Sequence, residues 1–250
     1  MRDTRIKARI APAPPVFPPV RSPLLGIVLL DTRFPRPHGD AGNPASWPVP
    51  TRVKVVAGAW PRKIVQLATG LRGAQVLGEF VGAVRQLAAE GACAITTSCG
   101  FLVLLQQELQ AGCGVPVVTS SLLQLPALLE EQERVGVLTI SAERLGEEHL
   151  LAAGVPRERL SDVAVQGVDP GSEFVRAILG NRATMDLQRA ARDVVAAAVA
   201  LKARAPQLRT LVLECTNMPP YAERIRAATG WRVLSLADSP LLRHALRQAG

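Results

Sequence analysis

Two cysteines in this 250-residue chain stand where a reactive thiol is expected. Cys99 follows the apolar run Ala92 to Ile95 through the polar residues Thr96 to Ser98, and Cys215 follows the apolar run Leu211 to Leu213. Each cysteine comes directly before a segment typical of a helix. Because the carboxyl ends of the strands form the ligand crevice of an open α/β sheet, both thiols are predicted to lie at its mouth.

A thiol in this position can take part in proton transfer. The positive end of a helix dipole favours the thiolate, and the unpaired N–H groups there can hold a substrate carboxylate. With one thiolate and one thiol on opposite sides of a bound carbon acid, one removes the α-proton and the other returns a proton from the far face. The pair therefore predicts inversion at a carbon next to a carboxylate, if both sulfurs reach it.

The other cysteines and the histidines indicate no metal site. Cys93 and Cys113 are expected to be buried small apolar residues, and the chain has no C-x-x-C pair. The three histidines, His38, His149 and His244, are far apart in sequence, which argues against zinc. His38 is interpreted as a solvated loop residue or a lid group, and the other two as surface residues. Reduced thiols are typical of a cytoplasmic protein.

Composition excludes several classes of protein. Hydrophobic residues make up 48% of the chain and aromatic residues 4%, which favours helices packed on sheets. The first 21 residues hold five basic residues and one acidic residue, which accounts for four of the eight net positive charges. We expect a disordered, basic, proline-rich tail over 1–23. The rest of the chain shows neither the basic face with interleaved aromatics of a nucleic-acid binder nor an apolar stretch long enough to span a membrane.

Strand-like and helix-like segments alternate along the rest of the chain. This alternation predicts an α/β fold of parallel sheets built from βαβ units. Strands are expected at 25–30, 53–56, 92–95, 115–118, 135–140, 163–165, 210–213 and 232–236, and helices at 72–90, 101–110, 122–131, 142–153, 173–179 and 184–205. We predict one lobe from 24–133 plus 215–250 and a second from 134–214. The long loop over 32–50 is expected to be functional or mobile.

Hydroxyl side chains follow one further predicted strand. Thr119, Ser120 and Ser121 come directly after the apolar run that ends at Val118. One of them is expected to cap the following helix. A capping hydroxyl at the mouth of the crevice can also face a ligand, so both roles stay open.

Four segments together resemble the aspartate/glutamate/hydantoin racemase superfamily. They occur in the family's order and are Asp40-x-Gly42-Asn43-Pro44, Thr96-Thr97-Ser98-Cys99-Gly100-Phe101, Val118-Thr119-Ser120-Ser121 and Leu213-Glu214-Cys215-Thr216-Asn217-Met218-Pro219-Pro220-Tyr221. The resemblance implies two pseudo-symmetric α/β lobes with the active site between them. It also implies chemistry without a cofactor and a homodimer.

The resemblance assigns roles to particular residues. It implies that Cys99 and Cys215 are the two acid/base groups, and that Asp31 or Asp40 is the acidic residue that orients a thiol or the substrate. The residues it implies for substrate binding are Asn43, Gly100, Thr119, Ser120, Thr216 and Asn217.

The expected function is racemisation or epimerisation of an amino acid or a derivative, with a small carboxylate as substrate. Glutamate is disfavoured, because glutamate racemases have Asn-Thr where this chain has Gly100-Phe101, and a histidine where it has Asn217. Related members isomerise maleate or decarboxylate arylmalonates with a cysteine, and both activities stay as alternatives. A small-molecule binder on the same scaffold, without catalysis, is a further alternative.

Overall fold

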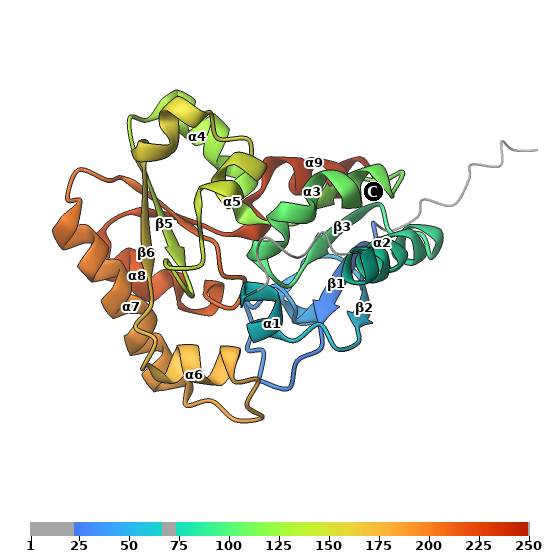
Figure 1. Cartoon of the computed structure of the whole chain (residues 1–250), viewed down its shortest axis with the longest axis horizontal. Coiled ribbons are helices and arrows are strands. Elements are labelled where there is room, and N and C mark those ends of the chain that lie inside the picture. The colour runs from blue at the N-terminus through green and yellow to red at the C-terminus, as the bar shows by residue number, and fades with distance from the viewer. Residues whose placement is uncertain (1–22, 67–73, 250) are drawn as a thin grey trace, which may run out of the picture.

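Two parallel sheets with the same strand order make up the computed structural model, which describes residues 23–66 and 74–249. The first sheet has the order β2-β1-β3-β4 and the second the order β6-β5-β7-β8, and Figure 1 shows the two sheets with their helices. The predicted α/β class with two parallel-sheet lobes is confirmed. Apart from Pro23, the predicted tail lies outside the described residues.

Most of the strands lie on or next to the continuous apolar runs of the sequence, because a strand that is buried on both faces needs apolar side chains throughout. Along β1, Leu25 and Ile27 pack toward one layer, and Val28 and Leu30 pack toward the other. The strands are β1 (Leu25–Leu30), β2 (Thr51–Val56), β3 (Ala94–Thr97), β4 (Val117–Val118), β5 (Val135–Thr139), β6 (Val163–Gly167), β7 (Thr210–Leu213) and β8 (Arg232–Leu234).

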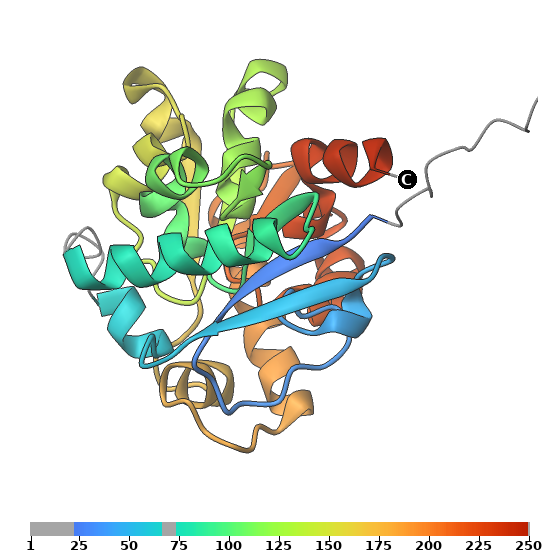
Figure 2. The ribbon, with the colours of Figure 1, turned by 90° about the vertical axis from the view of Figure 1, so that its right-hand side faces the viewer.

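Helices connect the parallel strands and cover the sheets. The helices are α1 (Pro61–Gln66), α2 (Ala74–Ala89), α3 (Gln106–Ala111), α4 (Leu125–Glu131), α5 (Glu147–Ala152), α6 (Glu173–Leu179), α7 (Leu187–Arg204), α8 (Ala222–Thr229) and α9 (Pro240–Gln248). Helix α2 lies across one face of the first sheet, as Figure 2 shows. Within the described ranges, no helix has the length and apolar character that crossing a membrane requires.

The end of the chain is shared between the two sheets. The predicted boundary assigned 215–250 to the first lobe, but β8 pairs with β7 in the second sheet. Only afterwards does α9 return to pack on β3 and β4 of the first sheet. A three-residue strand carries no sequence signal for the sheet that it joins, because the edge strand of either sheet could pair with its backbone hydrogen-bonding groups. The rest of the domain division stays a prediction.

One predicted surface residue is buried. His149 in α5 is fully shielded from solvent and packs edge-on against Phe101, with 5.0 Å between the ring centres. Its burial lowers the pKa of the imidazole, so the ring is neutral at physiological pH. His38 and His244 are exposed, as predicted.

Candidate active site

Both predicted thiols line one small cavity. Cys99 follows β3 and precedes a six-residue 3₁₀ helix, Gly100–Leu105, and Cys215 follows β7. Strands β3 and β7 hold equivalent places in the two sheets, so each sheet contributes one thiol. The walls are largely apolar and include Leu30, Phe34, Pro61, Val65, Ile140 and Leu179.

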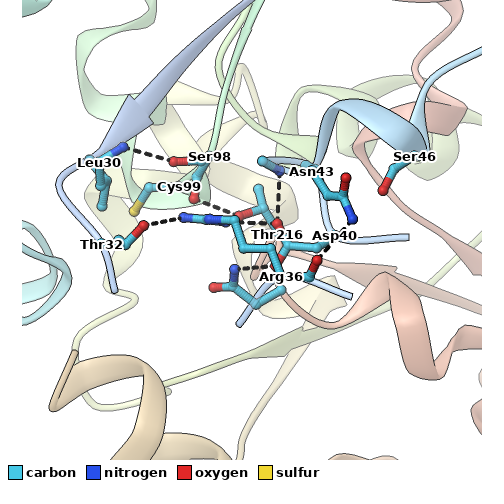
Figure 3. A network of polar contacts seen from close by, with 12 residues as sticks. Leu30, Thr32, Arg36, Asp40, Asn43, Ser46, Ser98, Cys99 and Thr216 are labelled. Carbon is cyan, nitrogen blue, oxygen red and sulfur yellow. Dashed lines mark hydrogen bonds and ion pairs between the residues drawn. The ribbon is translucent and has the colours of Figure 1, made fainter. Parts of the chain in front are cut away.

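Hydrogen bonds between the two cysteine turns fix their relative position. The Thr216 hydroxyl donates to the carbonyl oxygen of Ser98 at 2.6 Å, and the Thr216 carbonyl accepts from the Ala41 N–H at 3.1 Å. The Ser98 hydroxyl oxygen in turn accepts from the Leu30 N–H at 3.0 Å, and Figure 3 shows these contacts around Cys99. Thr216 therefore lines the cavity and also joins the two sheets.

Asp40 is the buried acid that is linked to Cys215 through Asn217. It is 1% exposed and accepts hydrogen bonds from Arg36 Nη1 and from Asn217 Nδ2, both at 2.7 Å. Asn217 Oδ1 then accepts from the Cys215 thiol, with 3.6 Å between sulfur and oxygen. Asp40 thus orients Cys215 through the Asn217 amide. Arg36 also donates to the Thr32 hydroxyl at 3.0 Å, beside Cys99 in Figure 3.

Asp31, the competing acid, lies away from the thiols. Its carboxylate accepts from the Gly58 N–H at 3.0 Å, and its backbone carbonyl accepts from Asn181 Nδ2 of the second lobe at 3.1 Å. Asn43 also lies outside the cavity lining. It caps the 3₁₀ helix Pro44–Ser46 and donates to the Arg36 carbonyl at 2.8 Å, so it supports the loop that carries Arg36.

Thr119 and Ser120 are buried and lie outside the lining of this cavity. Thr119 is fully buried and bonds Gln106 Oε1 through both its N–H and its hydroxyl. Ser120 accepts from the Leu122 N–H at 3.2 Å, which confirms the predicted helix cap. Neither residue lines the cavity with the two cysteines, whereas Gly100 and Asn217 do.

Burial keeps both thiols protonated at neutral pH. Desolvation and then the nearby Glu214 carboxylate raise the pKa of Cys99 to about 12, although the backbone N–H groups of Phe101 and Leu102 and the Arg36 charge act in the opposite direction. Desolvation, with Glu214 again the second cause, raises the pKa of Cys215 well above its ordinary value. The helix-end effect expected from the sequence is present at Cys99 but is outweighed.

Glu214 is a site residue that the sequence reasoning missed. Its side chain is fully buried, its Oε2 accepts from the Thr139 hydroxyl at 2.7 Å, and its Oε1 has no hydrogen-bond partner among the described residues. Burial raises the pKa of this carboxyl to about 7. The available sequence signal was an acidic residue directly after an apolar strand. Arg36 was missed as well, because it lies in a long loop without periodicity.

The raised pKa of Glu214 predicts a stability difference that depends on pH. The native carboxyl keeps its proton up to about pH 7, whereas the unfolded carboxyl loses it near its ordinary value of 4.5. Wild type is therefore expected to lose on the order of 3 kcal/mol relative to Glu214→Gln as the pH rises through that interval. Urea unfolding of both proteins at a series of pH values measures this difference. A constant difference across the interval contradicts the expected titration.

Gly100 leaves room for the Glu214 carboxyl. A Cβ at this position lies 2.3 Å from both the backbone oxygen and Oε1 of Glu214. Gly100→Ala is expected to cost about 1–3 kcal/mol of unfolding free energy and to displace the neighbouring Cys99, which lowers activity. The matched control is Gly82→Ala on the exposed face of α2, where a Cβ meets no atom within 4 Å. This control should be stabilised by about 0.5–1 kcal/mol; equal stability of both variants in urea contradicts the close packing.

The two parallel sheets have the same strand arrangement, and one thiol follows the equivalent strand of each. This architecture is that of a two-lobed α/β protein of the racemase type. Residues 74–239 match the family model of the Asp/Glu/Hydantoin racemases, and the chain belongs to this family of enzymes. The predicted family membership is confirmed.

Sequence relatives include lyases. A dimethylsulfoniopropionate lyase from Durusdinium sp. clade D is 30% identical over 229 residues, which cover 89% of this chain and 74% of that protein. Dimethylsulfoniopropionate lyase 7 from Emiliania huxleyi (strain CCMP1516) is 31% identical over 219 residues, 83% of this chain. The match spans 62% of the Emiliania protein, which is less than two thirds of its length.

Solved structures show the same fold at lower identity. Unliganded arylmalonate decarboxylase superposes with a TM-score of 0.57 at 18% identity, over 91% of this chain and 93% of that one. The aspartate racemase of Picrophilus torridus gives a TM-score of 0.54 at 12% identity, over 91% of this chain and 94% of that one.

Proposed function

We propose that this protein removes the proton from the carbon next to a small substrate's carboxylate, with Cys99 and Cys215 as the acid/base groups. The observation that carries the proposal is the shared cavity, which both thiols line, one from each sheet. Arg36 lines the same cavity and supplies a positive charge for a carboxylate.

The favoured outcome is β-elimination from a sulfonio carboxylate such as dimethylsulfoniopropionate. A thiolate takes the α-proton, the new C=C bond forms, and the electron pair of the breaking C–S bond leaves with dimethyl sulfide, so acrylate is the second product. The similarity to dimethylsulfoniopropionate lyases over most of the chain supports this choice. The apolar walls, including Phe101, suit the methyl groups of the sulfonium.

The charge of such a substrate also helps to form the thiolate. Both thiols are protonated at neutral pH because burial and Glu214 raise the pKa of each. A sulfonium placed beside them opposes the effect of Glu214 and lowers the pKa of both thiols. Cys99 is the better candidate for the base, since two backbone N–H groups and Arg36 already favour its thiolate.

Racemisation or epimerisation of an amino acid or a derivative is the second candidate. The observation that favours it is the second thiol, because elimination needs one base and inversion needs an acid on the opposite face. In that reaction one cysteine removes the α-proton and the other donates its own proton to the planar carbanion. After one turnover the two cysteines have exchanged their protonation states.

Product analysis separates the two candidates. Purified protein is incubated with dimethylsulfoniopropionate, and dimethyl sulfide is measured by gas chromatography with acrylate by liquid chromatography. Parallel incubations with aspartate, glutamate and hydantoins are resolved on a chiral column. Equal amounts of sulfide and acrylate support elimination, and inversion without sulfide supports racemisation. Binding of these compounds without either product contradicts the proposed chemistry.

A further inference from the structure

Two ionisable side chains that line this one cavity each have a buried atom without a hydrogen-bond partner, and above the Glu214 pKa of about 7 the two groups carry opposite charges. The two atoms are Arg36 Nε and Glu214 Oε1, and neither finds a partner within residues 23–66 and 74–249. The Arg36 side chain is 11% exposed and Glu214 is fully buried. Leaving buried charged groups without partners is costly, so both atoms indicate a ligand that supplies the missing contacts.

Both side chains are held rigidly by their remaining atoms. The two terminal nitrogens of Arg36 donate to Asp40 at 2.7 Å and to Thr32 at 3.0 Å. Glu214 is fixed by Thr139 at 2.7 Å and packs against Gly100. Neither charged group can therefore turn to satisfy itself elsewhere without breaking existing bonds.

The two charges differ in how far the protein neutralises them. The positive charge of Arg36 already faces the Asp40 carboxylate in a buried ion pair. Glu214 has no cationic partner in any ion pair of the described residues, and the single described hydrogen bond of its carboxyl comes from a neutral hydroxyl. A carboxylate ligand alone would add a second negative charge to this cavity. A ligand that also carries a positive charge would balance Glu214.

We propose that the cavity selects zwitterions, with Arg36 Nε donating to the ligand's carboxylate and Glu214 Oε1 facing its cationic group, and that Glu214 determines this specificity. The inference rests on the proposed function, since it places the carbon between the two charges beside Cys99 and Cys215. The chemical class is a small carboxylate with a sulfonium or ammonium group one or two carbons away. Glu214 also couples binding to chemistry, because a bound cation offsets its effect on both thiols.

Binding of unreactive probes tests this selectivity without turnover. The probes are 3-(trimethylammonio)propionate as zwitterion, propionate as carboxylate alone and tetramethylammonium as cation alone. Titration calorimetry at pH 8 compares wild type with Glu214→Gln, which keeps the side-chain shape and removes the charge. Glu79→Gln, on the exposed face of α2, is the matched control.

Wild type and the control are expected to bind the zwitterion at least about tenfold more tightly than propionate. Glu214→Gln should lose about 10- to 100-fold in affinity for the zwitterion, while its affinity for propionate stays equal or rises. A wild type that binds propionate as tightly as the zwitterion overturns the inference, and so does a folded Glu214→Gln variant with unchanged selectivity. The comparison of zwitterion and propionate binding by wild type tests the inference even if the variant does not fold. Selective binding without any proton removal refutes the proposed function and leaves the zwitterion site standing.

Discussion

Cys99→Ser and Cys215→Ser are each expected to lower turnover by roughly 10²- to 10⁴-fold. Serine preserves the shape of the side chain, but its hydroxyl does not ionise in the range in which a thiol can. Both sulfurs line the same cavity, so each contacts a substrate that fills it. In elimination, one thiolate takes the proton and the other thiol hydrogen-bonds the charge that develops on the carboxylate. The rates of product release from wild type and both variants measure this effect.

Cys93→Ser is the matched control for these variants. Cys93 is a half-buried free cysteine outside the cavity, so its replacement should leave turnover near the wild-type rate. In racemisation, each single variant is expected to lose inversion and to keep α-hydrogen exchange on one enantiomer only. Full activity of either Cys99→Ser or Cys215→Ser contradicts a mechanism with two thiols.

Asp40→Ala is expected to have the largest effect on stability in the site, at about 3–5 kcal/mol of unfolding free energy. Removal of this carboxylate leaves the buried Arg36 charge without its ion pair and takes away the acceptor of the Asn217 amide. Turnover should fall as well, because Asn217 then no longer orients the Cys215 thiol. Urea unfolding and steady-state kinetics at a temperature where the variant is folded measure the two effects.

Asp31→Ala is the matched control, since the sequence left the two acids as equal candidates. The Asp31 carboxylate makes one described hydrogen bond, to the Gly58 N–H, and it forms no part of the cavity lining. Its loss should cost about 1 kcal/mol and leave kcat within a few-fold of wild type. A greater loss of kcat in Asp31→Ala than in Asp40→Ala contradicts the assignment of Asp40 as the acid that orients the Cys215 thiol.

Local sequence patterns predict the elements that local interactions define. The run Leu25–Leu30 forms β1 as predicted, because continuous apolar residues suit a strand buried on both faces. Helix Glu173–Leu179 also has its predicted bounds, with Ser172 capping its first turn. The predicted helix over 101–110 is wrong in its first half, where Gly100–Leu105 is a 3₁₀ helix. All six of these residues are buried, so no amphipathic period marks the helix type.

The residues of the site also divide into those that local sequence patterns predict and those that they do not. Cys99 and Cys215 are recognisable because each follows a strand, and strand ends are local features. The importance of Glu214 and Arg36 depends on contacts between the lobes, which no local pattern encodes. Glu214 is buried because β7 ends against the Gly100 turn of the other sheet. Thr119 and Ser120 have the right sequence position, yet their hydroxyls satisfy the adjacent helix and turn instead of facing the cavity.

The most direct test of the central claim is hydrogen exchange at the α-carbon in heavy water. Proton NMR follows dimethylsulfoniopropionate, amino acids and hydantoins with wild type and with the double variant Cys99→Ser/Cys215→Ser. We predict that wild type removes the α-hydrogen of at least one of these compounds, seen as deuterium in the substrate or product or as elimination, and that the double variant removes none. Binding of a compound by wild type without exchange or elimination across the whole panel contradicts the claim that the two thiols transfer protons. Equal exchange by the double variant contradicts it as well.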